Sequence, residues 1–287
     1  MQVQWFPGHM AKARREVEGN LRLVDFVIEL LDARAPLSSE NPMLHQIVQN
    51  KDKMVVLMKR DLADPNVTAA WLTYYKERNI PAVAVDASNR DDMKQVVQLA
   101  KQLGKKKIDQ LVAKGMKARP HRAMILGIPN VGKSTLINRL ANRKAAKTGD
   151  RPGITKQQLW IKIKKDFELL DTPGILWPKF EDQVVGYRLA SIGTIKDQVI
   201  SLQDIVVFVI KFLQRKYPDL LLERYGVEAD LDDMVEIFER IGKKRGALES
   251  GGEVDFDKVS ELVLRDLRSG RIGRVSLEAP DDVSMEE

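Results

Sequence analysis

Eight consecutive residues of this chain, Gly127 to Ser134, read GIPNVGKS and fit the phosphate-loop pattern G-x-x-x-x-G-K-[ST]. Such loops cradle phosphate oxygens with successive backbone N–H groups and with the N-terminus of the following helix. Lys133 is expected to reach the β- and γ-phosphates, and the Ser134 hydroxyl to bind Mg²⁺. The sequence therefore predicts a nucleotide site whose phosphate-binding residues are Asn130, Val131, Gly132, Lys133, Ser134 and Thr135.

Two segments downstream of this loop are expected to act as switches that respond to the terminal phosphate. The tetrapeptide DTPG, Asp171 to Gly174, follows a strand-like stretch. There Asp171 would hold Mg²⁺ through water, and the Gly174 N–H would sense the γ-phosphate. Thr155 ends the stretch RPGIT and would add a second hydroxyl ligand for Mg²⁺.

Two upstream segments have the residue types that read a guanine base. The Asp61 carboxylate can accept from the N1–H and exocyclic NH₂ of guanine, a pair that adenine lacks. Lys59 would pack its stem over the base, and Ala87 would offer its backbone N–H to the guanine carbonyl. The predicted base-side residues are Met58, Lys59, Arg60, Asp61, Asp86, Ala87 and Ser88. In an ordinary GTPase these elements follow the phosphate loop, so their order here predicts a circular permutation.

The elements that must position these residues alternate between strand-like and helix-like patterns, which is typical of a parallel α/β sheet. Strands are predicted over 26–31, 54–58, 81–85, 123–126, 158–163 and 167–170, and helices over 10–22, 65–78, 91–103 and 133–140. We therefore predict a permuted P-loop GTPase fold, with a mostly parallel sheet and helices on both faces, followed by a small all-α domain.

The predicted domains follow from where the pattern changes. The GTPase domain spans 1–178, with a base-recognition half at 1–104, a basic linker at 105–122 and a phosphate-loop half at 123–178. Helical spacing over 184–195, 231–241 and 256–267 predicts an α-helical RNA-binding domain at 179–278, with Gly242 and Gly270 as helix stops. Residues 279–287 are expected to be an acidic disordered tail.

Bulk composition narrows the class of protein and its partners. The 287 residues carry a net charge of +6, and the basic residues cluster in several runs, which suggests a polyanionic partner such as nucleic acid. There are no cysteines, so disulfides and thiolate metal sites are excluded. The N-terminus has no apolar signal-peptide core, and the longest apolar run, Ile205 to Ile210, is too short to span a bilayer. We expect a cytoplasmic protein that does not bind a membrane.

Taken together, the rotated order, WFPGHM at 5–10 and DRPGIT at 150–155 resemble the ribosome-biogenesis GTPase A (RbgA/YlqF) family, and the similarity runs through LDTPGILWPK at 170–179 to the helical tail. The resemblance implies a bacterial GTPase that binds GTP and GDP and acts in late assembly of the large ribosomal subunit, and we expect a monomer. It also implies that the C-terminal helical domain contacts ribosomal RNA. One position departs from the family: its base-recognition element is Asn-Lys-x-Asp, and here Met58 replaces the asparagine. Loss of that amide should weaken GTP binding by about 1–2 kcal/mol.

The residue that drives hydrolysis is not where small GTPases have it. Ile175 occupies the position of their water-orienting glutamine. The resemblance points to His9 instead. If helix 10–22 returns antiparallel to the next strand, His9 starts near the carboxyl edge of the sheet, where ligands bind. Asn130 resembles the asparagine by which potassium-activated GTPases hold K⁺. We expect slow intrinsic turnover that the ribosome accelerates.

Two other functions remain open from the sequence. Met58 and Ile175 would also suit a degenerate nucleotide site in a protein that is mainly an RNA-binding scaffold. A P-loop ATPase is the third possibility, which Asp61 and the switch layout disfavour. In the leading interpretation, the short connection Ile175 to Lys179 couples the γ-phosphate sensor to the helical domain.

Overall fold

The computed structural model of the chain describes residues 7–48, 51–146, 159–172, 174, 182–195 and 201–282. For residues 7–13 and 159 it describes the backbone alone. Among these residues no helix is both long and apolar enough to cross a membrane.

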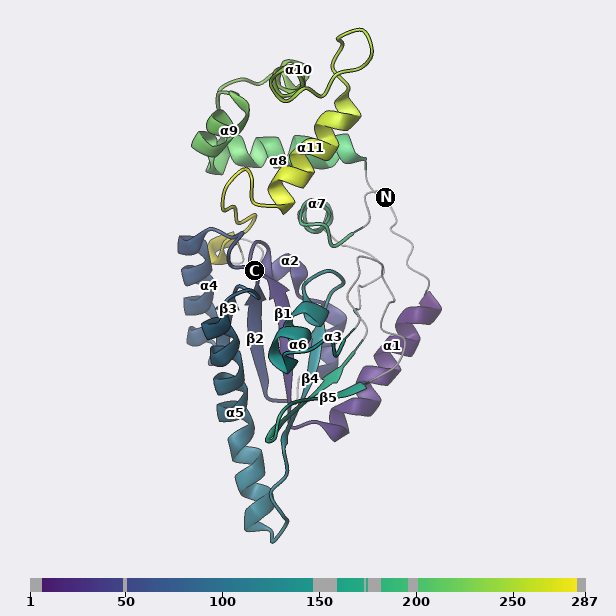
Figure 1. Ribbon diagram of the computed structural model, residues 1–287, viewed down its shortest axis with the longest axis vertical. Coiled ribbons are helices and arrows are strands. Elements are labelled where there is room, and N and C mark those ends of the chain that lie inside the picture. The colour runs from purple at the N-terminus through teal and green to yellow at the C-terminus, as the bar shows by residue number, and fades with distance from the viewer. Residues whose placement is uncertain are drawn as a thin grey trace.

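A six-stranded sheet forms the centre of the molecule, in the order β3-β2-β1-β4-β6-β5 (Figure 1). The strands are β1 (Phe26–Asp32), β2 (Lys53–Met58), β3 (Ala82–Val85), β4 (His121–Gly127), β5 (Leu159–Lys164) and β6 (Phe167–Asp171). All neighbours pair in parallel except β5, which is antiparallel to β6. The predicted mostly parallel sheet is therefore confirmed.

The strand order creates a topological switch point between β1 and β4. From β1 the chain moves outward to β2 and β3, whereas from β4 it moves in the opposite direction to β6 and β5. Ligands of open α/β sheets bind at such a point, outside the carboxyl ends of the strands. Because the phosphate-loop motif directly follows β4, the topology places it at this crevice.

Helices cover both faces of the sheet, as predicted. They are α1 (Pro7–Asn20), α2 (Pro36–Ser39), α3 (Pro42–Val48), α4 (Pro65–Glu77), α5 (Arg90–Ala113) and α6 (Lys133–Ala141), with a short 3₁₀ turn at Leu21–Leu23. Alternate residues of β1 point to opposite faces: Ile28 packs in the core with α5 and α6, and Val27 packs with α1 and α3. The aromatic side chain of Trp71 joins α4 to a third cluster on β1 and β2.

Among the described residues, the helices α7 to α11 lie beyond the carboxyl edge of the sheet (Figure 1). They are α7 (Gln183–Ser191), α8 (Leu202–Lys216), α9 (Pro218–Tyr225), α10 (Met234–Arg245) and α11 (Phe256–Arg268), followed by a 3₁₀ turn at Pro280–Asp282. The helical character of this region was predicted, but α8 and α9 were not resolved from the pattern. Their buried side chains form one contiguous cluster with those on the α5/α6 face of the sheet.

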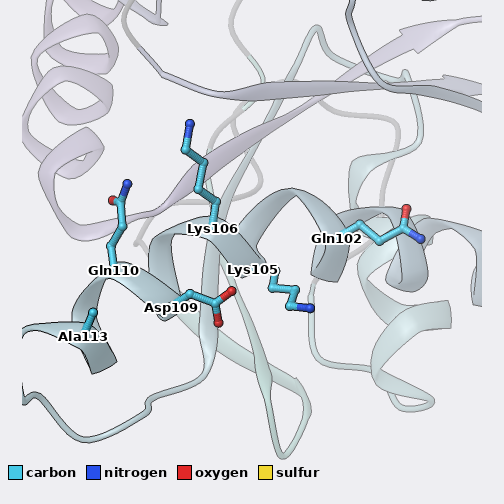
Figure 2. A pocket seen from close by; sticks show the side chains of 6 residues that line it. All are labelled: Gln102, Lys105, Lys106, Asp109, Gln110 and Ala113. Carbon is cyan, nitrogen blue, oxygen red and sulfur yellow. The ribbon is translucent and has the colours of Figure 1, made fainter.

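The basic segment predicted as a linker is largely helical. Residues 105–113 continue α5 without a break, and His121–Arg122 already belong to β4, so the irregular connection is only 114–120. Figure 2 shows this exposed C-terminal half of α5, where Lys105, Lys106 and Asp109 project from the helix. The prediction failed because a charged helix that buries few apolar residues lacks the apolar periodicity by which helices are recognised.

The C-terminal end also differs from its prediction. Residues 275–278 return to the GTPase half, where the Val275 N–H donates to the Leu62 carbonyl and the Leu277 N–H to the Arg34 carbonyl. The Trp71 indole N–H donates to the Glu278 carbonyl at 3.2 Å. The expectation of disorder from 279 is wrong for residues 279–282, because the docked segment 275–278 leads them into contact with α4.

Candidate nucleotide site

The phosphate loop has the backbone conformation that its glycines allow. Gly127 and Gly132 have φ of 156° and 112°, and Asn130 has φ of 58°. A Cβ at Gly127 would lie 2.9 Å from the Leu30 carbonyl of β1, so this position must be glycine for the loop to leave the sheet so closely. The loop then turns into α6 at Lys133.

Lys133 and Asp171 place opposite charges in a buried setting at the end of this loop. The Lys133 ammonium donates to the carbonyls of Gly127 at 3.0 Å and Ile128 at 3.3 Å. Burial lowers the pKa of Lys133 to about 8, although Asp171 partly opposes the shift. Burial likewise raises the pKa of Asp171, and Lys133 opposes that shift. The negative charge of a bound phosphate would stabilise the protonated form of Lys133.

Asp171 has the environment of a ligand for a hard cation. Its Oδ1 is buried and has no hydrogen-bond partner among the described residues. The Thr172 hydroxyl donates to the Ile125 carbonyl at 2.6 Å, which holds the end of β6 against β4. Mg²⁺ prefers carboxylate and hydroxyl oxygens completed by substrate phosphates, so Asp171, together with Ser134 on α6, fits this ion.

Gly174 lies directly against the phosphate-loop lysine. A Cβ there would be 2.8 Å from the Lys133 Nζ and 3.1 Å from the Pro129 backbone. Any larger residue would displace the lysine or the loop. The structure therefore brings the second predicted switch to the phosphate loop.

Lys59 connects the base side to the phosphate loop, although the two segments are far apart in the sequence. Its backbone is left-handed, with φ of 61°. Its ammonium donates to the Asp32 carboxylate at 2.9 Å and to the Asn130 carbonyl at 3.0 Å. The rotated order of the motifs is thus reconciled in space, where they share one edge of the sheet.

Among the other base-side residues, Arg60 supports a neighbouring loop through hydrogen bonds. The Arg60 guanidinium forms a bidentate ion pair with the Asp92 carboxylate, at 2.6 and 3.0 Å. The same carboxylate also accepts from the Asp86 N–H at 2.7 Å. Arg60 therefore fixes the second base loop, where the Ser88 N–H and hydroxyl donate to the Asp86 carboxylate.

The exposed Asp61 carboxylate makes no hydrogen bond or ion pair to the described residues, which leaves it available to a ligand. Ala87 lies half-buried beside the second base loop.

Met58 contacts the phosphate loop at the position where an asparagine amide was expected. Its side chain is 1% exposed, and its Cε would lie 2.9 Å from a Cβ at Gly132. An apolar contact therefore supports the loop here in place of a hydrogen bond.

Asp32 and Arg34 belong to the site but were not selected from the sequence. The Arg34 guanidinium donates to both carboxylate oxygens of Asp32, at 2.9 and 2.8 Å. Burial would raise the pKa of Asp32, yet the positive charges of Arg34 and Lys59 hold it well below its ordinary value. The available signal was the pair of charged residues Asp32 and Arg34 at the end of a buried strand.

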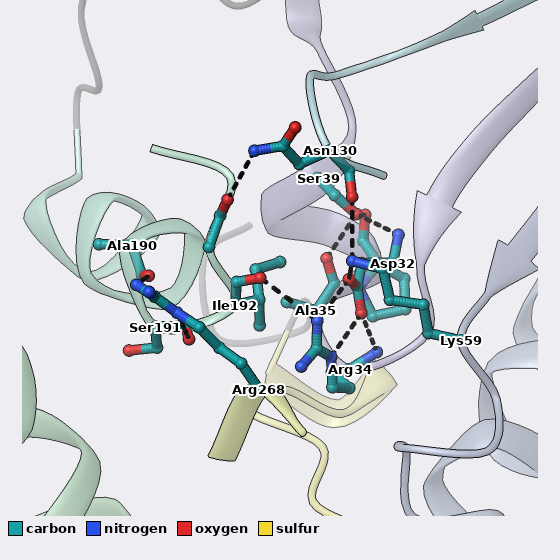
Figure 3. Close-up of polar contacts among 12 residues, drawn as sticks. Asp32, Arg34, Ala35, Ser39, Lys59, Asn130, Ala190, Ser191, Ile192 and Arg268 are labelled. Carbon is teal, nitrogen blue, oxygen red and sulfur yellow. Dashed lines mark hydrogen bonds and ion pairs between the residues drawn. The ribbon is translucent and has the colours of Figure 1, made fainter. Parts of the chain in front are cut away.

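The C-terminal end of α7 meets this network through its backbone carbonyls (Figure 3). The Asn130 amide Nδ2 donates to the Gly193 carbonyl at 3.0 Å, and Arg34 donates to the Ile192 carbonyl at 3.4 Å. From α11, Arg268 donates to the carbonyls of Ser191 at 3.2 Å and Ala190 at 2.8 Å. Four successive carbonyls at the negative end of a helix dipole are thus each capped by a donor.

His9, the residue expected to act in hydrolysis, is described by its backbone alone. His9 lies in the first turn of α1, which begins on the side where the strands end and runs antiparallel to β1 (Figure 1). The antiparallel return that was expected for this helix is therefore present, and the His9 side chain lies outside what the structure describes. Thr155 and Ile175 also lie outside the described residues.

The chain is similar to known GTPases over almost its whole length. A curated protein named Ribosome biogenesis GTPase A from Bacillus cereus is 54% identical over 282 residues, 98% of this chain and 95% of that protein. A protein of the same name from Priestia megaterium is 55% identical over 98% of both chains. The solved GNP-bound YlqF from T. maritima is 27% identical, with a TM-score of 0.67, over 94% of this chain and 99% of that one.

The family described as "50S ribosome-binding GTPase" matches residues 122–245. That match begins at the phosphate-loop strand and excludes the base-side residues, which precede it in this chain. The near-complete coverage by relatives more than half identical, on a nucleotide site assembled from permuted segments, shows that this chain belongs to the ribosome biogenesis GTPase A family.

Proposed function

We propose that this GTPase binds the large ribosomal subunit and acts in its late maturation in the cytoplasm, with hydrolysis stimulated by the ribosome and coupled to release. The observation that carries the proposal is the hydrogen bond from Asn130 of the phosphate loop to Gly193 at the end of α7. Through it the nucleotide site touches the helical region directly. The family names of the relatives supply the ribosomal context.

Each site residue has a proposed role that suits its surroundings. Lys133 binds the β- and γ-phosphates, and Gly174, against its ammonium, senses the terminal one. Asp61 reads guanine, while Arg60 and Lys59 hold the base-side loops in place. The backbone N–H groups of the loop from Asn130 to Thr135 complete the phosphate cradle.

Two metal ions complete the proposed site. Mg²⁺ would be held by Ser134, Thr155 and, through water, Asp171, whose buried Oδ1 accepts no hydrogen bond from the described residues. When bound, this ion would neutralise the charge that develops on the phosphate oxygens. We propose Asn130 as a ligand for an activating K⁺; its amide nitrogen donates to Gly193, and its amide oxygen accepts no hydrogen bond from the residues that the structure describes.

The proposed coupling uses the capped end of α7. A change at Asn130 on nucleotide binding would alter the bond to Gly193, and the neighbouring Arg34 and Arg268 would carry that change to the helices. This contact complements the short connection at 175–179. Equal affinity of the protein for large subunits in GTP-like and GDP states would refute the coupling.

The direct test is GTP turnover in potassium buffer, with and without purified large ribosomal subunits. Strong stimulation is expected. Tight subunit binding without stimulation would instead favour the second candidate, an RNA-binding scaffold, which the apolar Met58 contact in the site favours. Competition between GTP and ATP in the same assay would separate the guanine reader from an ATPase.

Met58→Asn is expected to tighten GTP binding by roughly tenfold, because a buried amide beside Gly132 can supply a hydrogen bond worth about 1–2 kcal/mol. Isothermal titration with GTP measures the change. Met58→Leu, an apolar replacement of similar volume, is the matched control and should leave the affinity unchanged. If both variants bind GTP like the unmodified protein, the assignment of this position to base and loop recognition is wrong.

GTP binding is expected to take up protons near pH 8. The free Lys133 has a pKa of about 8, and bound phosphates would raise it, so binding at pH 8 should take up about half a proton. Affinity should then decline as the pH rises through 8. Titration calorimetry in buffers of different ionisation enthalpy measures the uptake. Lys133→Arg stays charged throughout this range, so the uptake should disappear in that variant.

The same shift affects stability in the opposite sense. Lys133 binds fewer protons in the folded protein than in the unfolded one between pH 8 and its ordinary pKa of 10.5. Its destabilising contribution is therefore complete below pH 8 and is relieved as the pH rises toward 10.5.

Variants at Asn130 are expected to separate potassium activation from coupling. Asn130→Ala removes both the candidate K⁺ ligand and the bond to Gly193, so turnover in KCl should fall to the NaCl level, and the subunit affinity should no longer depend on the nucleotide. Asn130→Asp keeps an oxygen ligand but loses the donor. It should retain the KCl-to-NaCl ratio and lose the nucleotide dependence. If Asn130→Asp loses the KCl-to-NaCl ratio together with the nucleotide dependence, the two roles of Asn130 are not separable.

A further inference from the structure

The C-terminal part of α5, from Lys105 onward, extends beyond the buried part of the helix. With 24 residues, α5 is about 36 Å long, whereas a six- or seven-residue strand spans about 20 Å. The buried residues of the helix end at Gly104. Between residues 105 and 117, hereafter the α5 arm, no side chain is buried, and Ile108 and Leu111 are half-buried. Core formation therefore does not explain the arm.

The arm carries an unbalanced positive charge. It contains one acidic residue, Asp109, against the five lysines Lys105, Lys106, Lys107, Lys114 and Lys117. None of these lysines forms an ion pair with the residues that the structure describes. The basic residues where the arm joins the sheet do form ion pairs: Lys101 pairs with Asp166, and Arg119 pairs with Asp25 at 2.6 Å. The fold thus neutralises the base of the arm and leaves its length charged.

The positive surface continues onto a neighbouring segment. Lys51 donates to the Val24 carbonyl at 2.8 Å. Burial and the charge of Lys107 lower the pKa of Lys51, against the opposite influence of Asp25 and Asp52. Lys107 therefore lies close enough to Lys51 for the two charges to repel each other. Such repulsion is relieved when a polyanion binds across both.

The arm lies at the opposite end of the molecule from the helices α8 to α11 (Figure 1). It leads into the first residue of β4, so it is at the edge where the strands begin, while the phosphate loop follows the other end of β4. A partner bound at the arm would leave the nucleotide site uncovered.

We propose that the α5 arm is a second RNA-binding surface, which holds the phosphate backbone of ribosomal RNA independently of the helical C-terminal region. The inference rests on the proposed function, because the ribosomal subunit supplies the RNA. Figure 2 shows the shallow face that would meet it, lined by Gln102, Lys105, Lys106, Asp109, Gln110 and Ala113. The arm contains no aromatic residue for base stacking, so its contacts read charge rather than sequence.

RNA fits this surface better than a lipid bilayer does. An interfacial helix needs a continuous apolar face opposite its cations. On the arm only Val112 and Met116 are large, apolar and well exposed, at 48% and 55%. Ile108 and Leu111 are half-buried, so the arm has no continuous exposed apolar face.

The test compares the salt dependence of binding to purified large ribosomal subunits. The triple substitution Lys105→Gln, Lys106→Gln and Lys107→Gln should make the slope of log affinity against log salt shallower by about 2–3, because each lost phosphate contact contributes about 0.7–0.9. The affinity at 0.1 M KCl should fall by roughly tenfold to a hundredfold. Intrinsic GTP turnover should not change. The matched triple substitution to arginine keeps the charges and should retain the slope.

The outcomes separate this inference from the proposed function. If the unmodified protein does not bind large subunits, both fail. If it binds them and the glutamine variant has the same affinity and slope, the arm proposal alone is overturned. It is also overturned if the variant loses binding to vesicles of phosphatidylglycerol and phosphatidylcholine but keeps subunit binding. A change at the arm that adds to the effect of Lys243→Gln and Lys244→Gln on α10 would support two independent surfaces.

Discussion

Lys133→Ala is expected to lower the affinity for GTP by about a hundredfold or more. The ammonium is buried at the end of the phosphate loop, where charge-assisted hydrogen bonds contribute about 1.5–3 kcal/mol each, and it would bond two phosphates. Turnover should fall at least as strongly, because the same charge stabilises the transferring phosphoryl group. Titration calorimetry and a phosphate-release assay measure the two effects.

GMP provides the control for this substitution. It has the base and the α-phosphate but lacks the two phosphates assigned to Lys133, so its affinity should be unchanged in the variant. The fold should also survive, since removing a buried cation relieves the desolvation that lowers its pKa. Equal losses for GMP and GTP would mean that the loop has collapsed, and the assigned role of the lysine would be withdrawn.

His9→Ala is expected to abolish most of the ribosome-stimulated turnover and to spare GTP binding. A side chain that orients or deprotonates the attacking water contributes about 10²–10⁴-fold. No other candidate is available at the position of Ile175, whose side chain can neither donate nor accept. Single-turnover hydrolysis with saturating large subunits measures the loss, and equilibrium titration with GTP shows whether binding is preserved.

His45→Ala is the matched control for His9. This histidine is 55% exposed on α3, where it contacts Glu40 at 3.2 Å, and it should be replaceable without effect on stimulated turnover. A loss of GTP binding in His9→Ala, or equal turnover in the two variants, would remove His9 from the catalytic step. The first outcome would give His9 a structural role in the entry to α1.

Local patterns predicted most of the GTPase half of the fold. Five elements lie close to their predicted ranges: the buried strands β1, β2 and β4 and the helices α4 and α6. Short apolar runs, helical spacing and the phosphate-loop motif can each be recognised within a short stretch of sequence. Helix α5 was cut short at Leu103, since its charged half has no apolar stripe to reveal it. Gly242 was expected to end a helix but lies inside α10, where its missing side chain admits Val254.

In the site, too, residues that belong to short motifs were found from the sequence, and residues whose role depends on distant contacts were not. Lys133, Asp171, Gly174 and Lys59 were selected by motif, and the structure gathers them at one edge of the sheet. Asp32 and Arg34 were missed because their importance depends on Lys59 and Ile192, which are distant in the chain. The roles assigned to His9 and Thr155 remain predictions.

The sequence by itself determined the motifs of the nucleotide site: a phosphate loop, an aspartate proposed to read guanine and two proposed switches, in an order that requires permutation. These are encoded in short motifs whose backbone geometry depends on their own glycines and flanking elements. Only the tertiary structure decided which distant segments are in contact at the site. The contacts of Asn130 with Gly193, of Arg34 with Ile192 and of Met58 with Gly132 join segments that the sequence separates widely, and they exist because the sheet order and the helices beyond its carboxyl edge bring those segments into van der Waals range.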